Sequence, residues 1–390
     1  MSTETAPAID PPSTTPPDAV TVTDLQVHFP LRTGVLRRVT GSARAVDGVS
    51  FTVPARSIVT IVGESGSGKT TTGRALVGLS PVVAGEILIE GRPLAGLRAD
   101  KSLPRVAQIV HQDPYASLNP RMTIGAMIRE VVQVHRTVPR EQAGERAAQL
   151  LAQVGLAPEL ADRHPHELSG GQRQRAAIAR ALAVEPRFIV CDEIVSALDV
   201  SVQGQIVNLL KDLRRDSEVS FLFISHDMSV VRHISDRVVV MYGGRIMESG
   251  PCAEVFASPR HPYTHSLLAA VPVPDPRAPL PGAGTRSRAE PPDPADPPPG
   301  CRFQRACPFA TELCRTEPPP TTEVPGPGTR TDRSGPPGSP DHPDHPDHRD
   351  HRDHRDHRDH RDHPAHTIAC HHHDEPAVRA ALSTERTAHP

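Results

Sequence analysis

The sequence predicts an α/β fold, with helices on the faces of a mostly parallel sheet. Short apolar runs rich in β-branched residues alternate along the chain with stretches of helical periodicity, which is the pattern of such folds. Composition places this domain in the middle of the 390 residues, because 30 of the 44 prolines and 13 of the 22 histidines lie outside residues 21–270. A region of that size can bury a substantial core.

Six strands are expected, and most of them are buried. The run at 57–62 is bounded by turn residues, as a buried parallel strand would be. A basic loop extending to about residue 43 is expected to separate the first two strands. The expected strands cover residues 20–29, 46–53, 57–62, 106–110, 188–191 and 221–224.

Two helices are predicted from apolar residues at i, i+3, i+4 and i+7 spacing. We interpret both apolar stripes as core packing. The first consists of Ile124, Met127, Ile128 and Val131, and the second of Ala147, Leu150, Leu151 and Val154.

Charge and hydropathy argue against several functional classes. The formal net charge of -3 argues against a mainly electrostatic binder of nucleic acid or of a membrane surface. Apolar runs fall far short of the roughly 20 residues that a membrane helix needs. The start of the chain has no pattern of a secretory signal, so the cytosol is the expected location. There, the six cysteines are expected to be thiols or metal ligands.

A phosphate-binding loop follows the strand at 57–62. The segment GESGSGKT at 63–70 fits G-x-x-x-x-G-K-[ST] between a strand and a helix, and its lysine is one of only three in the chain. The glycines allow backbone N–H groups to point inward as an anion nest, the lysine would reach the β and γ phosphates, and the threonine would bind Mg²⁺. The predicted ATP-binding residues are Gly63, Glu64, Ser65, Gly66, Ser67, Gly68, Lys69, Thr70 and Thr71.

Two carboxylates, Asp192 and Glu193, end the strand-like segment RFIVCDE. A carboxylate at this place can hold Mg²⁺, and its neighbour can orient or deprotonate the attacking water. We therefore assign Asp192 to the metal, together with Thr70, and Glu193 to catalysis.

The segment HELSGGQRQRAAIARAL strongly resembles the nucleotide-binding subunits of ABC transporters. Small residues at the start of a helix offer free N–H groups to an anion. The resemblance implies that this second site faces the γ-phosphate of ATP on another subunit. It also implies an ABC cassette: a P-loop NTPase with a RecA-like, mostly parallel core, an antiparallel β subdomain and a helical subdomain. The signature residues are Leu168, Ser169, Gly170, Gly171 and Gln172.

Four further residues take roles that the resemblance implies. Gln112 matches the family glutamine that contacts Mg²⁺ and water, and His226 matches the histidine on the γ-phosphate. Asp199, in SALD, matches the loop that crosses the dimer interface. Phe29 is the candidate for stacking on adenine.

The resemblance divides the chain into four regions. An N-terminal segment at 1–20 is expected to be disordered, and the cassette covers 21–272, with its helical subdomain at about 113–170. A proline-rich linker and cysteine cluster follow at 273–316. Residues 317–390 form a low-complexity His/Asp/Arg/Pro tail, which is expected to be largely disordered.

Within the family, the chain resembles the ATPases of oligopeptide, dipeptide and nickel importers. The matching stretches are QDPYASLNPRMTIG, DEIVSALDVSVQGQIVNLL and HPYTHSLLAAVP, and LNPRM favours the F-type of the two ATPases that these importers pair. The segment GCRFQRACPFATELC and a later cysteine also match. Four thiolates suit zinc or an iron-sulfur cluster, and the family favours the cluster, while inert thiols remain an alternative. These cysteines are Cys301, Cys307, Cys314 and Cys370.

The histidine tract at 342–363 matches no family pattern. In a polyproline II helix its imidazoles would line one edge and could buffer Ni²⁺ or Zn²⁺. Repeat expansion without function is the other interpretation.

The expected function is that of an ATPase that energises an importer of oligopeptides or dipeptides. Its expected cofactors are ATP and Mg²⁺, with an iron-sulfur cluster as a third if the four cysteines bind one. The expected partners are a second ABC ATPase, two permease subunits and an extracytoplasmic binding protein, with no nucleic acid. The chain would then lie peripherally on the cytoplasmic face of the cell membrane. A nickel or other small-solute importer and a soluble ABC ATPase are the alternatives.

Overall fold

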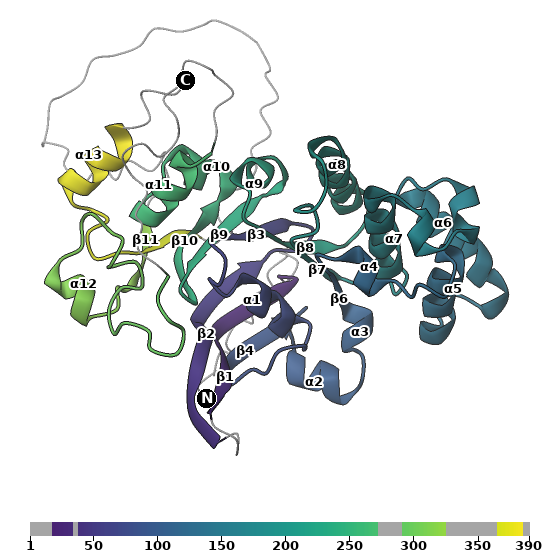
Figure 1. The fold of residues 1–390 in the computed structure, drawn as a ribbon, viewed down its shortest axis with the longest axis horizontal. Helices are drawn as coiled ribbons and strands as arrows, with labels where there is room; N and C mark the ends of the chain where they lie inside the picture. Colours follow the sequence, from purple (N-terminus) through teal and green to yellow (C-terminus); the bar gives the residue numbers. More distant parts are fainter. Residues whose placement is uncertain (1–17, 34–37, 272–290, 325–364, 385–390) are drawn as a thin grey trace, which may run out of the picture.

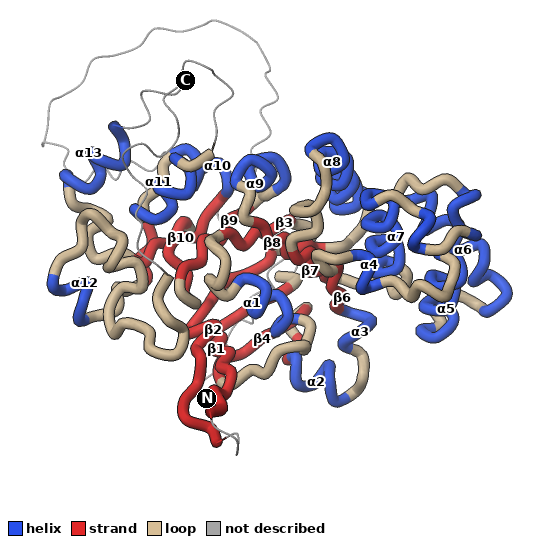
Figure 2. Tube along the Cα trace, in the orientation of Figure 1, coloured by secondary structure: helices blue, strands red, loops and turns tan. Residues whose placement is uncertain are grey.

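The larger of two sheets forms the centre of the molecule. The computed structural model describes residues 18–33, 38–271, 291–324 and 365–384 (Figure 1). Within them, the large sheet has the strand order β11-β12-β10-β9-β3-β8-β7-β6, and a second sheet has the order β2-β1-β4-β5. Figure 2 shows the strands of both sheets at the middle of the molecule and helices around them.

Five neighbouring strands of the large sheet are parallel. Almost all of their residues are buried, which the apolar β-branched runs predict for strands covered on both faces. All four parallel strands expected from the sequence are confirmed. The five are β3 (Ile58–Val62), β6 (Ala107–Val110), β7 (Phe188–Asp192), β8 (Ser220–Ser225) and β9 (Arg237–Tyr242).

The antiparallel sheet begins with a long hairpin of β1 (Val20–Thr33) and β2 (Arg38–Val53). Strands β4 (Ala84–Ile89) and β5 (Arg92–Pro93) complete it. The expected basic loop up to residue 43 is wrong in its extent, because Arg38 already pairs with Thr33. Cross-strand hydrogen bonds hold this arginine-rich ribbon in strand conformation even though its side chains are exposed.

Helices connect the strands of the two sheets. Helix α1 follows β3 and packs against β7 and β8, so its first turn stands at the ends of the parallel strands. The connecting helices are α1 (Lys69–Leu76), α2 (Leu94–Ala99), α3 (Leu103–Val106), α8 (Val200–Asp216) and α9 (Met228–Ile234).

A helical subdomain forms one end of the molecule, at the right of Figure 1. The apolar stripes predicted from spacing lie in α5 and α6 and belong to one core cluster, which confirms their interpretation as packing. The subdomain contains α4 (Pro114–Ser117), α5 (Ile124–His135), α6 (Ala143–Gln153), α7 (Gly170–Leu182) and the 3-10 turns η1 (Arg140–Gln142), η2 (Pro158–Asp162) and η3 (Pro165–Glu167).

The C-terminal part lies at the opposite end (Figure 1) and includes two strands, β11 and β12, and a helix, α13, within the tail at 317–390 that the sequence analysis expected to be largely disordered. In β12, Ile368 pairs with Glu248 of β10 and with Thr322 of β11, so the tail extends the main sheet. The elements are β10 (Arg245–Pro251), α10 (Cys252–Ala257), α11 (Pro262–Ala269), α12 (Glu312–Thr316), β11 (Thr321–Val324), β12 (His366–Ala369) and α13 (Pro376–Thr384).

Other predicted segments lie outside the described residues: most of the N-terminal segment, much of the proline-rich linker and the histidine tract. None of the helices in the described part of the chain is long and apolar enough to span a bilayer.

Candidate nucleotide-binding site

The loop between β3 and α1 requires glycine at two positions. Gly63 and Gly68 have φ values of 150° and 100°, which residues with a side chain rarely adopt. A Cβ at Gly63 would lie 2.1 Å from the carbonyl oxygen of Met241, and one at Gly68 would lie 2.4 Å from that of Ala45. The loop is thus folded tightly against neighbouring backbone, and a side chain at either position would displace it.

Lys69 lies buried at the start of α1. Its Nζ donates hydrogen bonds to the carbonyl oxygens of Gly63, at 2.9 Å, and Glu64, at 2.8 Å. Burial lowers the pKa of Lys69, and the carboxylates of Glu193 and Asp192 act in the opposite direction. The ammonium group is therefore held in place over the loop by two backbone oxygens.

Three features of this loop fit a phosphate group. Helix α1 has Gly68 as its N-cap and no side-chain cap, so no side chain of the described residues occupies its first N–H groups. The hydroxyl of Ser67 is buried and has no hydrogen-bond partner among the described residues. Gly66, at φ 79°, has open space where a Cβ would project. The predicted anion nest fits this geometry.

Thr70 and Asp192 present a pair of oxygen atoms beside this loop. The Thr70 hydroxyl donates to Asp192 Oδ1 at 2.8 Å. Burial raises the pKa of Asp192, while the Thr70 hydrogen bond and Arg74 oppose that effect. A hydroxyl and a carboxylate are the ligands that Mg²⁺ prefers, so the two side chains fit a magnesium ion bound with the phosphates.

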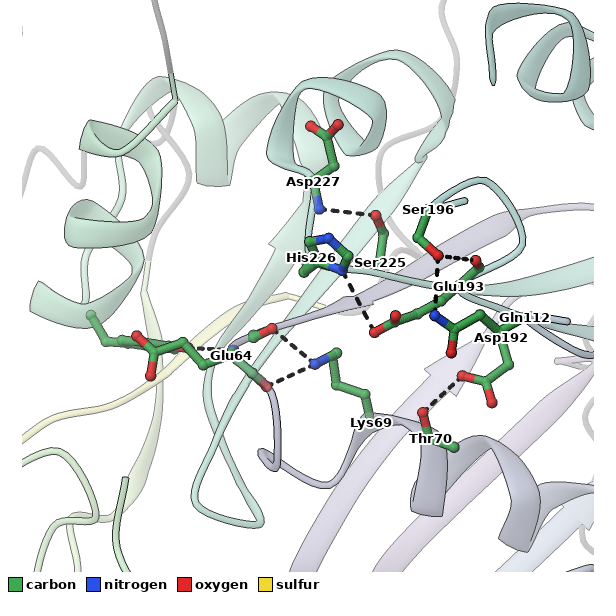
Figure 3. A network of polar contacts seen from close by, with 12 residues as sticks. Glu64, Lys69, Thr70, Gln112, Asp192, Glu193, Ser196, Ser225, His226 and Asp227 are labelled. Atoms are coloured by element: carbon green, nitrogen blue, oxygen red, sulfur yellow. Dashed lines mark hydrogen bonds and ion pairs between the residues drawn. The ribbon is translucent and has the colours of Figure 1, made fainter. Parts of the chain in front are cut away.

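Glu193 follows Asp192 and lies between two of the other predicted catalytic residues. Its Oε1 lies 3.6 Å from Nδ1 of His226, and its backbone adopts φ 50°, an uncommon conformation for a side-chain-bearing residue. Ser196 Oγ donates to the Glu193 carbonyl at 2.8 Å and accepts from Gln112 Nε2 at 3.3 Å. Figure 3 shows that the site draws Lys69, Thr70, Gln112, Asp192, Glu193 and His226 together.

The signature residues form the beginning of α7, in the helical subdomain and away from α1 (Figure 1). Ser169 is the N-cap: its hydroxyl oxygen accepts from the Gln172 amide at 3.3 Å, and the Gln172 side chain accepts from the Ser169 amide at 2.9 Å. The hydroxyl oxygen and Gln172 therefore shape the helix end. A Cβ at Gly171 would lie 2.5 Å from Val202, so glycine permits the close contact with α8.

Two more predicted residues lie outside the Lys69–Glu193 group. Asp199 caps α8 by accepting from the Val202 amide at 2.9 Å, and a hydrogen bond from Ser201 is the main cause of its lowered pKa. Phe29 is 39% exposed on β1, opposite Ala43 and near the part of β2 that contacts Gly68.

Cys370 lies near the other three C-terminal cysteines although it is distant from them in sequence. The thiols of Cys314 and Cys370 act electrostatically on those of Cys301 and Cys307. Burial is the main cause that raises the pKa of Cys301 to about 11 and that of Cys307 to about 12. Even so, in the part of the chain that the structure describes, no three His, Cys, Asp or Glu side chains are arranged to hold a metal ion.

Tyr263 is a residue at the site that the sequence analysis did not single out. Its hydroxyl accepts a hydrogen bond from the Glu64 amide at 2.9 Å. Two signals were available: it lies in the stretch HPYTHSLLAAVP, which matches the importer ATPases, and it follows a proline at a helix start. These signals predict a helix beginning but no contact with a loop 199 positions earlier.

Comparisons with known proteins agree with this geometry. Residues 46–196 match the family described as ABC transporter, and residues 247–314 match the oligopeptide/dipeptide transporter C-terminal region. The chain is 49% identical over 309 residues to the probable peptide ABC transporter ATP-binding protein y4tS of Sinorhizobium fredii, covering 78% of this chain and 86% of that protein. It is 46% identical to the oligopeptide transport ATP-binding protein AppF of Bacillus subtilis, covering 77% and 92%.

A third relative is the glutathione import ATP-binding protein GsiA of Escherichia coli, which is 55% identical over 65% of this chain and 41% of its own length. Among solved structures, cbiO1 of Clostridium perfringens, described as part of the ABC transporter complex cbiONQ, matches with a TM-score of 0.53 and 26% identity over 62% of this chain and 91% of that one. The ATP-binding cassette MJ0796, solved as a dimer bound to ADP and Pi, matches with a TM-score of 0.52 and 27% identity over 60% and 98%. The chain belongs to the family of ABC transporter ATP-binding proteins, whose members hydrolyse ATP.

Proposed function

We propose that this chain is the ATP-hydrolysing subunit that energises an importer of oligopeptides or dipeptides. The observation that carries the cargo class is the match of residues 247–314 to the oligopeptide/dipeptide transporter C-terminal region. The relatives y4tS and AppF, which match over most of their lengths and are named for peptide transport, support it.

We assign a separate role in hydrolysis to each side chain of the site. Lys69 offers its charge to the β and γ phosphates, and the amides of the loop and of the first turn of α1 bind their oxygens. Thr70 and Asp192 would hold Mg²⁺, which neutralises charge developing on the phosphates. Glu193 orients the attacking water or accepts its proton, His226 would contact the γ-phosphate, and Gln112 would contact Mg²⁺ and the water.

A second subunit is part of this proposal. The N-terminus of α7 lies in the helical subdomain, apart from the phosphate loop of its own chain (Figure 1). We assign it to the nucleotide of a partner, so that each subunit supplies two half-sites. The dimeric form of the cassette MJ0796 is consistent with this arrangement.

The other partners follow from the importer role. We propose a heterodimer with a second ABC ATPase, two permease subunits and an extracytoplasmic substrate-binding protein, with this chain peripheral on the cytoplasmic face of the membrane. Nucleic acid is not among the proposed partners. Peptide, nickel and other small solutes would be distinguished by the pocket of the binding protein.

A second proposal concerns a metal site at the four cysteines of the C-terminal region. We assign Cys301, Cys307, Cys314 and Cys370 to one site with four thiolate ligands, for which an iron-sulfur cluster is the favoured occupant. What supports it is that Cys370 lies close enough to the segment 301–314 for its thiol and those of Cys301, Cys307 and Cys314 to influence one another electrostatically. No step of ATP hydrolysis depends on it.

The catalytic assignment is tested with Glu193→Gln in the assembled transporter. We expect ATP to bind normally and turnover to fall about 100-fold or more, because the amide cannot accept the proton of the water. ATPase rate and nucleotide binding are measured beside Glu218→Gln, which changes a surface carboxylate paired with Arg56 and Arg187. Turnover of Glu193→Gln near that of the control would remove Glu193 from this role.

A further inference from the structure

One peptide unit of the phosphate loop is held at both ends. The carbonyl of Gly63 accepts from Lys69 Nζ at 2.9 Å, and the N–H of Glu64, in the same planar unit, donates to the Tyr263 hydroxyl at 2.9 Å. Rotating this plane would break both hydrogen bonds together. The Tyr263 contact therefore bears directly on where the Lys69 ammonium group is held (Figure 3 shows Lys69 beside Glu64).

Tyr263 is itself rigidly placed. Its side chain is 1% exposed, and its ring centroid lies 4.7 Å from that of Tyr242 and 5.2 Å from that of Phe303. Its backbone N–H, in the first turn of α11, donates to Nδ1 of His261 at 3.0 Å. Neither the ring nor the backbone of Tyr263 can move without disturbing a packed neighbour.

Glu248 connects this helix start to the tail strand. Its Oε2 accepts from the His261 amide at 3.0 Å, and its Oε1 accepts from the Arg260 amide at 2.9 Å and lies 2.8 Å from Nε2 of His366. The side chains of Glu248 and His366 are 0% and 3% exposed. A continuous series of buried hydrogen bonds thus runs from β12 through α11 to the phosphate loop.

We propose that Tyr263 is a positioning residue for ATP binding, which acts by fixing the Gly63–Glu64 peptide and, through it, Lys69. The C-terminal region holds this tyrosine in place through the hydrogen bonds of Glu248 and His261. The inference rests on the proposed function, because it requires that nucleotide binds at this loop. It gives the oligopeptide-type C-terminal region a role in the catalytic site of its own chain.

The test compares Tyr263→Phe with Tyr242→Phe in the full chain, assembled with its partner subunits. Both substitutions remove one hydroxyl from the same aromatic cluster and keep the ring, but only the first removes the hydrogen bond to the loop. We expect the KM for ATP of Tyr263→Phe to rise about fivefold, the effect of one neutral hydrogen bond. Its kcat should stay close to wild type, because Lys69 binds ground state and transition state alike.

Two further measurements separate positioning from general destabilisation. Amide exchange over residues 63–68 should accelerate in Tyr263→Phe, while that of β3 and the unfolding midpoint should match Tyr242→Phe. An unchanged KM and unchanged exchange in Tyr263→Phe, or equal KM changes in both variants, would overturn the inference. Wild-type protein that binds no ATP would instead refute the proposed function, so the two failures are distinguishable.

Discussion

His261 is a histidine that stays neutral in the folded chain over most of the physiological pH range. Burial lowers its pKa to about 4, although the Glu248 carboxylate acts in the opposite direction. The neutral ring is what lets Nδ1 accept a hydrogen bond from the Tyr263 amide and cap α11. Protonation of that nitrogen would remove the cap and bury a charge.

Because His261 is buried in its neutral form, we expect the folded chain to lose stability in acid. Because the pKa of His261 is lower in the folded than in the unfolded chain, its contribution is complete above about pH 6.5 and is lost as pH falls toward 4. The loss at pH 4 is as much as about 3 kcal/mol of the free energy of unfolding. His261→Asn, which can still cap a helix, should flatten this dependence in urea unfolding between pH 6.5 and 4.

The matched control is His233→Asn, which changes an exposed histidine of α9 and should leave the wild-type pH dependence in place. If His261→Asn lost stability as steeply as wild type over the same pH range, the buried neutral histidine would not be its source.

Site residues that belong to a local sequence motif could be predicted from the sequence. Asp192 ends a strand whose apolar run is visible in the sequence, and Lys69 and Glu193 follow such strands; parallel strands bring their carboxyl ends to one edge. Tyr263 was not predictable in this way, because its partner is a backbone N–H that carries no side-chain signal. The capping role of the Ser169 hydroxyl was also missed, since helix caps and anion sites favour the same residue types.

At the scale of elements, long periodic segments were predictable and short pairings were not. The stripes of α5 and α6 repeat over about two turns, whereas β12 has four residues beside low-complexity sequence. Its pairing with β10 depends on a buried partner for His366, which only the folded chain supplies. Strand pairing likewise extended β2 to Arg38, where composition alone had suggested a loop.

The cysteines of the proposed metal site come from different parts of the C-terminal region. Three lie within residues 301–314, and the fourth directly follows β12. Anaerobically purified protein should contain iron and acid-labile sulfide, with broad absorbance that Cys307→Ser abolishes. Deleting residues 341–362 should preserve both the iron and the ATPase activity, because β11 and β12 remain and shortening the connection changes the closure entropy by only about 0.6 kcal/mol per halving.

Metal content and absorbance are compared with those of Cys252→Ser, which alters a buried cysteine of α10 outside the four. Zinc in stoichiometric amount without sulfide would point to a structural four-thiolate site, and the absence of any metal would leave these thiols without the proposed role. Loss of iron on the deletion would instead make the tract histidines ligands.

For the whole molecule, the two helix starts that we propose to bind phosphate lie in different parts of the fold. Helix α1 begins at the centre of the sheet, and α7 begins in the helical subdomain at one end (Figure 1). One chain therefore holds the two proposed half-sites apart from each other. This division was predictable from the family resemblance of LSGGQ, but not from periodicity or composition, which carry no information on how two subunits meet.

The last prediction tests this arrangement. Ser169→Arg places a bulky cation at the start of α7, where it would occupy the space of the phosphate bound by the partner, and it also costs about 1 kcal/mol as a lost cap. We expect hydrolysis to fall at the partner's phosphate loop, while ATP binding at Lys69 of the altered chain persists. Thr123→Arg supplies the control, because it removes the cap of α5 in the same subdomain. Hydrolysis is measured in heterodimers in which only one phosphate loop is intact. Failure confined to the altered chain's own loop would show that each chain completes its own site.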